Sequence, residues 1–594
     1  MTGRSTYAGR QVGRRQAAQS RSFTLLMTGL CALWVLSSGA SGFIRLSRRQ
    51  LCGLARQPIP RATLKSPLPL RLAHRTAAVA TPKEAKVAKP AADAEPEISI
   101  DQHRQMRLEK VEAMREAGME PFAYEYVVSH TADVLQNEHK DLADGARDEA
   151  AEVSVAGRIM AKRTMGKLAF LKLQDHTGTV QLFFESKQLG AEFKSALEWI
   201  TLGDIVGARG SMLRTKKGEL SVLVTEWTML SKALLPLPDK YHGLTDKETR
   251  YRQRHLDMIA NPAVADTFRA RAKLTSSLRR RLDEQGFLEI ETPVLQDEAG
   301  GAAAKPFTTY YNALKRPMTL RIATELHLKR LIIGGIDRVY ELGRLFRNEG
   351  LSLRHNPEFT TVELYQAYAD YSTMMTVAET IISGLATELL ESTHIPYGED
   401  MLDLTPPFRR VSMYELVQEA TDVDFSGDIS VEEAKAVAKK VGVREAALAN
   451  LTSIGEVATE IFEECCEANL WQPTFVTDLP IEVSPLAKQH RTKPGLTERF
   501  ELYIAGRELA NAYSELNDPI EQRRRFEAQA IKQAMGDEEA CGVDEDFLLA
   551  MEQGMPPTAG MGIGVDRLAM LLTNSPSIRD VIAFPQMRRE LQDE

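Results

Sequence analysis

The sequence predicts an α+β protein in which a small β-barrel precedes a larger domain that mixes helices and strands. Between residues 151 and 235, five runs rich in β-branched, apolar and aromatic residues follow one another, and turn-forming glycines separate most of them. After a Pro-rich hinge at 235–239, an amphipathic pattern over 263–284 predicts a long helix. Short strands and charged turns then alternate over 320–370. The length of 594 residues agrees with several domains.

The N-terminal segment differs in composition from the rest of the chain. Residues 1–83 contain twelve Arg, two Lys and no Asp or Glu, although the whole chain has a formal charge of -8. An apolar run over 25–36 follows five arginines and precedes small residues, as in a signal peptide. It is shorter than the roughly 20 residues that cross a bilayer. A segment from Phe43, rich in Arg, Ser, Ala and Pro, has transit-peptide composition.

These features predict that residues 1–97 form a bipartite targeting leader and a disordered linker, with no membrane attachment in the mature form. The stretch 40–43 resembles the cleavage boundary of leaders that carry proteins into plastids acquired by secondary endosymbiosis. A plastid is therefore the predicted location. A mitochondrion, or both organelles, is the alternative, because Arg-rich leaders of the two overlap in composition. A disordered basic tail is the remaining interpretation.

Three regions are predicted after the leader. Residues 98–150 form a helical extension, with charged helical periodicity over 100–117. Residues 151–235 form a Greek-key barrel of the oligonucleotide-binding kind, with a helix over 191–200. Its strands are predicted at 153–159, 168–173, 179–184, 205–210 and 220–225. Residues 236–594 form the larger domain, with a helical insertion around 405–470.

Barrels of this kind bind single-stranded bases by stacking and by polar contacts. Phe170 and Gln181 stand where a strand face could present an aromatic platform and an amide, and Arg158 supplies positive charge. Periodicity alone favours a core position for Phe170. Because the chain is acidic overall, any basic surface for nucleic acid must be local.

The first segment with residues suited to catalysis is 344–360, where the pattern predicts a strand, a charged loop and a second strand. There the planar guanidinium of Arg347 could neutralise charge on an α-phosphate, and His355 could reach distal phosphates. An Arg-rich solvated loop is the alternative. Burying so many charges beside apolar rings without a ligand would, however, cost free energy.

Two further segments carry candidate chemistry. In 501–515, the spacing of Glu501 and Glu508 suits binding of a hard cation beside phosphates, with acids on a helix surface as the alternative. The glycine-rich segment 560–567 leads into an apolar helix with Arg567 at its entrance, which permits close approach of the backbone to a nucleotide.

The five cysteines show no C-x-x-C or Cys/His spacing. Neither a zinc site nor a disulfide framework is therefore expected, and we predict reduced, structural thiols.

In this order the three segments resemble the motifs of class II aminoacyl-tRNA synthetases, and 100–588 resembles the lysyl family of bacterial and organellar type. The resemblance implies a class II catalytic domain with an antiparallel sheet, preceded by an OB-fold anticodon-binding domain. It implies a lysine–tRNA ligase that joins L-lysine to tRNA(Lys) in organellar translation, using ATP as substrate and Mg²⁺ as cofactor. It also implies a homodimer, with Pro293 at the interface because Thr292-Pro293 resembles the end of motif 1.

The resemblance also implies the site residues. Arg347 and Arg567 would be catalytic. The lysine-binding set would be Gly301, Glu325, Glu363, Tyr365, Asn511, Tyr513 and Glu515. The ATP-binding set would be Arg347, Glu349, His355, Phe359, Glu501, Gly562 and Arg567, with Glu501 and Glu508 as metal ligands. The anticodon set would be Arg158, Phe170 and Gln181. Tyr513 occupies a position where bacterial relatives also have phenylalanine.

The residues themselves favour lysine, because Glu363 and Glu515, with Tyr365, offer anionic and polar partners to a buried ammonium group. An aspartyl or asparaginyl synthetase shares the same motifs. Against it, the same two carboxylates would repel an aspartate side chain. The barrel argues against a ligase that modifies an elongation factor with lysine, and intact Arg347 and Arg567 argue against a catalytically silent tRNA-binding paralogue.

Overall fold

The computed structural model describes residues 99–238, 244–537 and 539–588. The predicted leader and linker at 1–97 lie outside the described residues. None of the described helices combines the length and apolar composition that a membrane-spanning segment requires.

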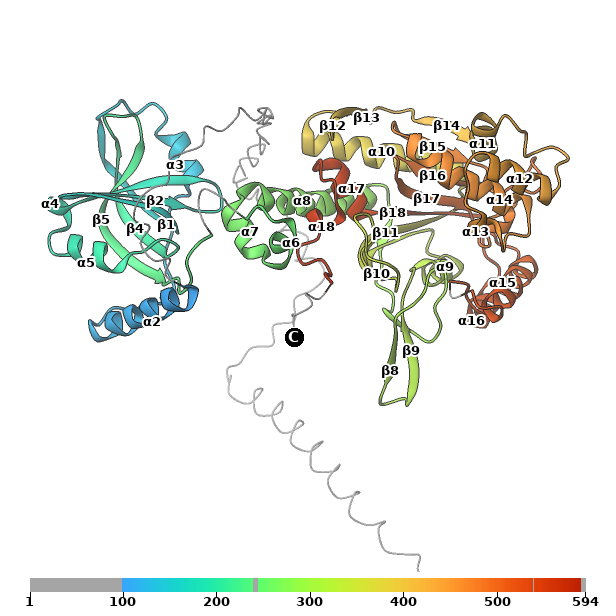
Figure 1. Cartoon of the computed structure of the whole chain (residues 1–594), viewed down its shortest axis with the longest axis horizontal. Helices are drawn as coiled ribbons and strands as arrows, with labels where there is room; N and C mark the ends of the chain where they lie inside the picture. Colours follow the sequence, from blue (N-terminus) through green and yellow to red (C-terminus); the bar gives the residue numbers. More distant parts are fainter. Residues whose placement is uncertain (1–98, 239–243, 538, 589–594) are drawn as a thin grey trace, which may run out of the picture. The chain divides into compact units, whose positions relative to one another are not determined.

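The predicted β-barrel is present as a closed five-stranded barrel with strand order β1-β2-β3-β5-β4 (Figure 1). Its elements are β1 (Arg147–Met165), β2 (Leu168–Gln174), β3 (Thr179–Glu185), α4 (Ser186–Leu189), α5 (Glu192–Trp199), β4 (Ile205–Arg214) and β5 (Leu220–Ser231). Helices α2 (Ile100–Glu116) and α3 (Ala132–Glu138) precede it. β1 begins at Arg147, earlier than predicted, because its pairing with β4 continues beyond an irregularity between Asp148 and Val153.

The larger domain is built on an eight-stranded sheet with order β14-β15-β16-β17-β18-β11-β10-β6. In that order the strands are Arg409–Ser412, Thr474–Thr477, Arg499–Tyr503, Glu508–Ser514, Thr558–Gly564, Glu358–Ala367, Arg338–Phe346 and Leu288–Glu289. The six inner strands are antiparallel, as expected, whereas the two edge strands β14 and β6 are parallel to their neighbours.

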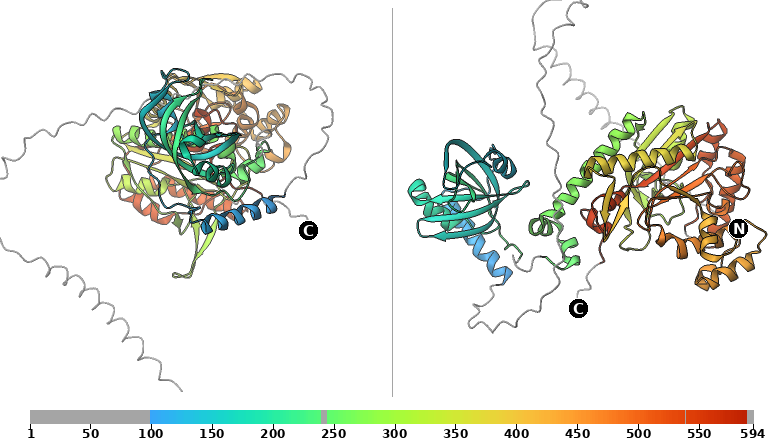
Figure 2. Two further views of the ribbon diagram at one scale, coloured as in Figure 1. Left: turned by 90° about the vertical axis from the view of Figure 1, so that its left-hand side faces the viewer. Right: turned by 90° about the horizontal axis from the view of Figure 1, so that it is seen from above.

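One face of this sheet packs against α8 (Pro262–Glu284), α10 (Tyr371–Leu390) and α17 (Val565–Leu572) (Figures 1 and 2). Helix α8 confirms the predicted long helix: it begins at a proline, and Leu274, Leu278 and Leu282 repeat at helical spacing on its buried side. The apolar residues of the central strands, such as Leu364 and Met561, alternate toward these helices. The opposite face of the sheet therefore presents the intervening, mostly polar side chains.

Shorter elements complete the domain. Helices α6 (Lys247–Arg252) and α7 (Arg254–Ala260) precede α8, and α9 (Glu325–Ile333) precedes β10. A three-stranded sheet, β7 (Leu295–Gln296), β9 (Arg316–Leu320) and β8 (Thr308–Tyr311), carries a hairpin that projects from the domain (Figure 1). Pro293 is exposed just before β7.

The predicted helical insertion contains α11 (Met413–Thr421), α12 (Val431–Lys440), α13 (Glu445–Leu448) and α14 (Ile454–Ile461). A π-helical turn (Phe462–Cys466) and a 3-10 turn (Glu467–Asn469) follow, and a hairpin of β12 (His394–Tyr397) and β13 (Asp400–Asp403) precedes. Helices α15 (Pro519–Ala534) and α16 (Glu545–Glu552) connect β17 to β18, and α18 (Ile578–Val581) follows α17. The insertion has its own apolar core.

Candidate active site

The floor of the candidate site consists of two rows of residues that cross the polar face of the eight-stranded sheet. Strand register places the first row in the order Glu501, Asn511, Gly562, Glu363. It places the second row in the order Arg499, Tyr513, Gly560, Tyr365. The rows are two residues apart on each strand, so their side chains project from the same face. Residues far apart in the sequence thereby converge on one surface.

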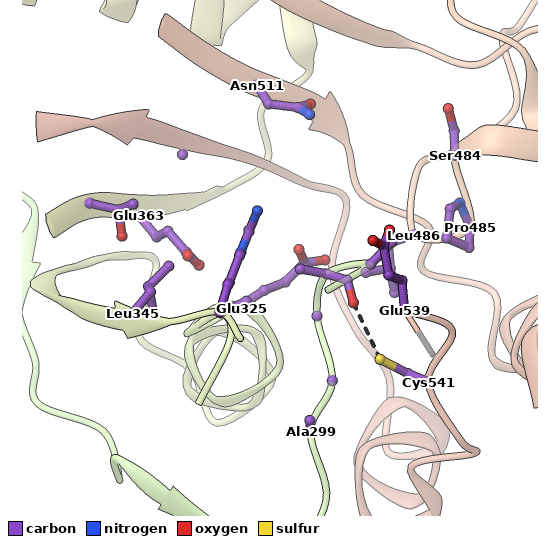
Figure 3. A pocket seen from close by; sticks show the side chains of 18 of the residues that line it. Ala299, Glu325, Leu345, Glu363, Ser484, Pro485, Leu486, Asn511, Glu539 and Cys541 are labelled. Carbon is purple, nitrogen blue, oxygen red and sulfur yellow. Dashed lines mark hydrogen bonds between the residues drawn. The ribbon is translucent and has the colours of Figure 1, made fainter. Parts of the chain in front are cut away.

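A cavity of about 960 Å³ lies over this floor. The predicted lysine-binding, ATP-binding and metal-binding residues that line it are Gly301, Glu325, Arg347, Glu349, His355, Phe359, Glu363, Tyr365, Glu501, Glu508, Asn511, Tyr513, Gly562 and Arg567. Among the predicted residues of these three sets, Glu515 alone is absent from the lining. Figure 3 shows Glu363 and Glu325 on one side of the cavity and Pro485 and Glu539 on the other.

Sequence reasoning did not single out the side of the cavity formed by residues 481–487, 537, 539–542 and 544. The Cys541 thiol in this segment donates a hydrogen bond to the Ala302 carbonyl, with an S···O distance of 3.2 Å (Figure 3). This bond connects the segment to the loop that contains Gly301. The segment has no motif of its own, and its place beside the cavity depends on tertiary structure.

The two glycines in the floor have different surroundings. A Cβ atom at Gly560 would lie 2.2 Å from Glu515 Oε1 and 2.3 Å from the Tyr365 ring. A Cβ atom at Gly562 would approach only Glu363 Cγ, at 3.7 Å. Gly560 is therefore required by packing, whereas Gly562 leaves open space over the floor.

The acidic end of the cavity comprises Glu363 on its floor, Glu325 beside the floor, and Glu515, which is next to Gly560 but outside the lining. All three are buried, with 4%, 8% and 1% of their surface exposed. Burial raises the pKa of Glu363 to about 7, although the Thr324 backbone N–H donates to its carboxylate at 3.2 Å. The Tyr365 hydroxyl lies 3.5 Å from Glu363 Oε2. Such a site attracts a cation strongly, since a bound positive charge relieves the cost of burying carboxylates.

Sequence reasoning missed Lys329, which lies beneath the acidic end. Its ammonium group pairs with Glu325 Oε1 at 2.5 Å and with Glu515 Oε2. Tyr513 donates its hydroxyl to Glu325 Oε2 at 2.6 Å. The sequence signal was the spacing of four residues between Glu325 and Lys329, which is also the pattern of an ordinary ion pair on a helix surface.

The cavity lining outside the acidic end includes the basic residues Arg347, His355 and Arg567, and we call this part the basic end. The Arg347 guanidinium lies over the Phe359 ring, 5.4 Å from its centroid, and its buried Nε has no hydrogen-bond partner among the described residues. Arg567 donates to Glu508 Oε2 at 3.1 Å. Burial and the nearby Arg567 charge lower the pKa of His355. The predicted strand, charged loop and strand around Arg347 is confirmed as β10 and β11.

The carboxylates Glu501 and Glu508 lie on β16 and β17, so the alternative of acids on a helix surface is wrong. Arg499 donates to Glu501 Oε1 at 2.6 Å, and Tyr503 donates to Oε2 at 2.7 Å. Burial, and then the negative charge of Glu508, raise the pKa of Glu501, an arrangement that fits a divalent cation between them. Within residues 99–238, 244–537 and 539–588, no group of three or more His, Cys, Asp or Glu side chains is arranged as a metal site.

The barrel brings two of its three predicted anticodon-binding residues together. Phe170 is half-buried on the outer face of β2, so the interpretation as a core residue is wrong. The centroid of its ring lies 5.0 Å from that of the Phe183 ring, and Gln181 lies two residues before Phe183 on the same face of β3. Arg158 instead pairs with the far end of β2, and its guanidinium donates to the Gly203 carbonyl at 2.7 Å.

Comparison with known proteins agrees with this architecture. Residues 246–588 match the model of the class II tRNA synthetases (D, K and N), and residues 153–230 match that of the OB-fold nucleic acid binding domain. A lysine–tRNA ligase from Thermosynechococcus vestitus is 58% identical over 496 residues, which cover 82% of this chain and 97% of that protein. The chain belongs to the class II lysyl-tRNA synthetase family.

Two further lysine–tRNA ligases support the assignment to this family. That of Synechococcus sp. (strain RCC307) is 56% identical over 82% of this chain and 97% of its own length. That of Trichormus variabilis is 56% identical over 83% of this chain and 89% of its own length. In this family member, the barrel is therefore the OB-fold anticodon-binding domain, and the eight-stranded sheet belongs to the class II domain.

Proposed function

We propose that this lysine–tRNA ligase activates L-lysine with ATP and transfers the lysyl group to the 3′ end of tRNA(Lys) in the translation system of an organelle. The observation that carries the proposal is the cavity floor. Its two rows of residues lead from Glu363 and Tyr365, at an end suited to a cationic amino acid, to Glu501 and Arg499, and the same cavity contains Arg347, Arg567 and Glu508, which suit a nucleoside triphosphate.

At the acidic end, the lysine ε-ammonium would lie among Glu363, Tyr365 and Glu515. The support is that Glu515 Oε1 is buried above the floor without a hydrogen-bond partner among the described residues. Such an oxygen is costly unless a ligand supplies a donor. Glu325 and the backbone at Gly301 would receive the α-ammonium, with Tyr513 orienting the Glu325 carboxylate.

Arg347 and Asn511 would hold the lysine carboxylate near the α-phosphorus of ATP. The reaction then needs no protein nucleophile, because the carboxylate attacks the α-phosphorus, pyrophosphate leaves, and a ribose hydroxyl of the tRNA 3′ end displaces AMP. Positioning and charge neutralisation account for catalysis of this kind. The unpartnered Arg347 Nε supports a ligand at this point.

The rest of the basic end would hold ATP. Phe359 and Arg567 would enclose the adenine, Glu349 would contact its edge, and His355 would approach the distal phosphates. Gly562 leaves open floor for the nucleotide. Glu501 and Glu508 would bind Mg²⁺, which supplies neutralisation of phosphate charge when it is bound.

In the barrel, Phe170 would stack on an anticodon base, and Gln181 would contact a base edge. Arg158 would contribute positive charge near the backbone. Pro293 would lie at a homodimer interface, a proposal supported by its exposed place between α8 and β7.

We also propose import into a plastid, with the mitochondrion or both organelles as the alternative. The support is the charge and order of the segments within residues 1–83. Fusion of residues 1–97 to a fluorescent protein tests this. Fluorescence confined to plastids is expected, and fluorescence that remains in the cytosol would overturn targeting.

ATP–pyrophosphate exchange with residues 98–594, given each of the twenty amino acids in turn, tests the main proposal. Exchange with lysine alone is expected, and Glu515→Gln should weaken it, whereas the exposed control Glu432→Gln should not. Exchange with aspartate or asparagine would instead establish the alternative specificity. No exchange with any amino acid would favour a catalytically silent tRNA-binding paralogue.

A further inference from the structure

We propose that Lys329 is a positioning residue that sets the charge and geometry of the lysine subsite. By pairing with Glu325 and Glu515, it would leave the acidic end with two unbalanced negative charges, the number of ammonium groups on L-lysine. The inference rests on the proposed function and deepens it, because it explains how a site with three carboxylates remains matched to the two ammonium groups of the substrate.

The contacts of Lys329 do not fit a surface ion pair. The residue is fully buried in α9, with 0% exposure, and its ammonium lies 5.6 Å from the centroid of the Tyr513 ring and 5.8 Å from that of Phe547. A buried ammonium is retained only where carboxylates and aromatic faces compensate for lost hydration. The charged form of Lys329 is therefore stabilised by Glu325 and Glu515, and Lys329 stabilises the charged forms of these two carboxylates.

The pairing uses one oxygen of each carboxylate. Lys329 holds Glu325 Oε1, which leaves Oε2 to accept a hydrogen bond from the Tyr513 hydroxyl on the cavity floor. It holds Glu515 Oε2, which leaves Oε1 above Gly560, 2.2 Å from where a Cβ would stand. Oε1 has no hydrogen-bond partner among the described residues. Lys329 thus occupies one oxygen of each carboxylate and leaves the second oxygen outside the ion pair, next to Tyr513 in Glu325 and next to Gly560 in Glu515.

The charges at the acidic end agree with this role. Glu325, Glu363 and Glu515 are all buried, and Lys329 is the basic residue paired with two of them. Three carboxylates and one ammonium leave a net charge of about −2 when all are ionised. L-lysine would add two ammonium groups here, while its carboxylate would face Arg347. Without Lys329, three buried carboxylates would favour uptake of a proton over binding of the substrate.

Steady-state exchange with Lys329→Met tests the proposal. The KM for lysine should rise about ten-fold or more, as expected when charge-assisted hydrogen bonds are misplaced, while the KM for ATP changes less than about two-fold. The control Lys439→Met, at an exposed helix end, should change neither KM. Loss of thermal stability with an unchanged KM for lysine would show a structural role only and overturn the proposal.

A second comparison applies if Lys329→Met does not fold. Glu515→Gln alone leaves about one negative charge at the acidic end, and Lys329→Met with Glu515→Gln restores about two. The double variant should therefore have a lower KM for lysine than Glu515→Gln alone. A KM equal to or above that of the single variant would overturn the charge argument. Failure of the unmodified protein to exchange with lysine would instead refute the proposed function.

Discussion

Protonation of Glu363 should control the affinity for lysine near neutral pH. The carboxyl group is 8% exposed, and burial raises its pKa from the ordinary 4.5 to about 7. This difference corresponds to about 3 kcal/mol against the ionised form in the unliganded protein. A cationic side chain favours that ionised form, so lysine must displace the proton wherever the pH lies below about 7.

The expected dependence of lysine affinity on pH follows from this linkage between proton release and lysine binding. Below pH 7, affinity for lysine should fall about ten-fold for each pH unit, and above pH 7 it should be nearly constant. The folded protein binds this proton more tightly than the unfolded chain. Stability of the unliganded protein should therefore be greatest below pH 4.5 with respect to this group, and up to about 3 kcal/mol should be lost as the pH rises through 7.

Isothermal titration calorimetry with L-lysine, without ATP, measures this affinity over about pH 5.5 to 8.5. Omitting ATP keeps the titration of His355 and of the phosphates from entering the result. Glu363→Gln should bind more weakly at pH 8, by about ten- to a hundred-fold, and its affinity should change less with pH near 7 than that of the unmodified protein. The same slope in Glu363→Gln as in the unmodified protein would refute the reasoning.

Three further predictions concern other parts of the molecule. Phe170→Ala should lower kcat/KM for tRNA by about five- to a hundred-fold, as expected for loss of one base stack, and leave ATP–pyrophosphate exchange unchanged; reduced exchange would contradict it. Gly560→Ala should displace Tyr365 or Glu515 and raise the KM for lysine more than that for ATP, and equal effects would count against the packing argument. Leu364→Ala, at a fully buried position, should lower the free energy of unfolding in urea by about 2–5 kcal/mol, and a change below about 1 kcal/mol would show that the site can collapse.

Local patterns in the sequence were sufficient for the elements that depend on local preferences. The helix at 262–284 has a proline at its start and leucines at helical spacing, so its predicted range needed almost no correction. The barrel strands likewise alternate in burial along their length. By contrast, the order of the eight-stranded sheet, with its parallel edge strands, depends on pairing between distant segments and has no local signature.

The site shows the same division between local and tertiary information. Arg347, Glu501 and Arg567 stand in recognisable segments, and the structure brings them to one cavity. Phe170 was harder to place, because an aromatic residue in an alternating strand fits either face until the barrel closes. Lys329 could not be predicted as buried, because its spacing from Glu325 is the same in a solvated ion pair. The second ion pair of Lys329, with Glu515, forms between residues that are far apart in the sequence and therefore has no local signature.

The position of β18 has a consequence for synthesis of the protein. It is the last strand of the eight-stranded sheet to leave the ribosome, yet it lies between β17 and β11 and joins the two halves of both rows. A nascent chain that ends before residue 558 has two open strand edges at the centre of its future sheet, which invite pairing with other chains. Such a chain also lacks Gly562, which lies between Asn511 and Glu363 in the first row of the floor. Unfinished chains should therefore consume no ATP until the final strand enters the gap.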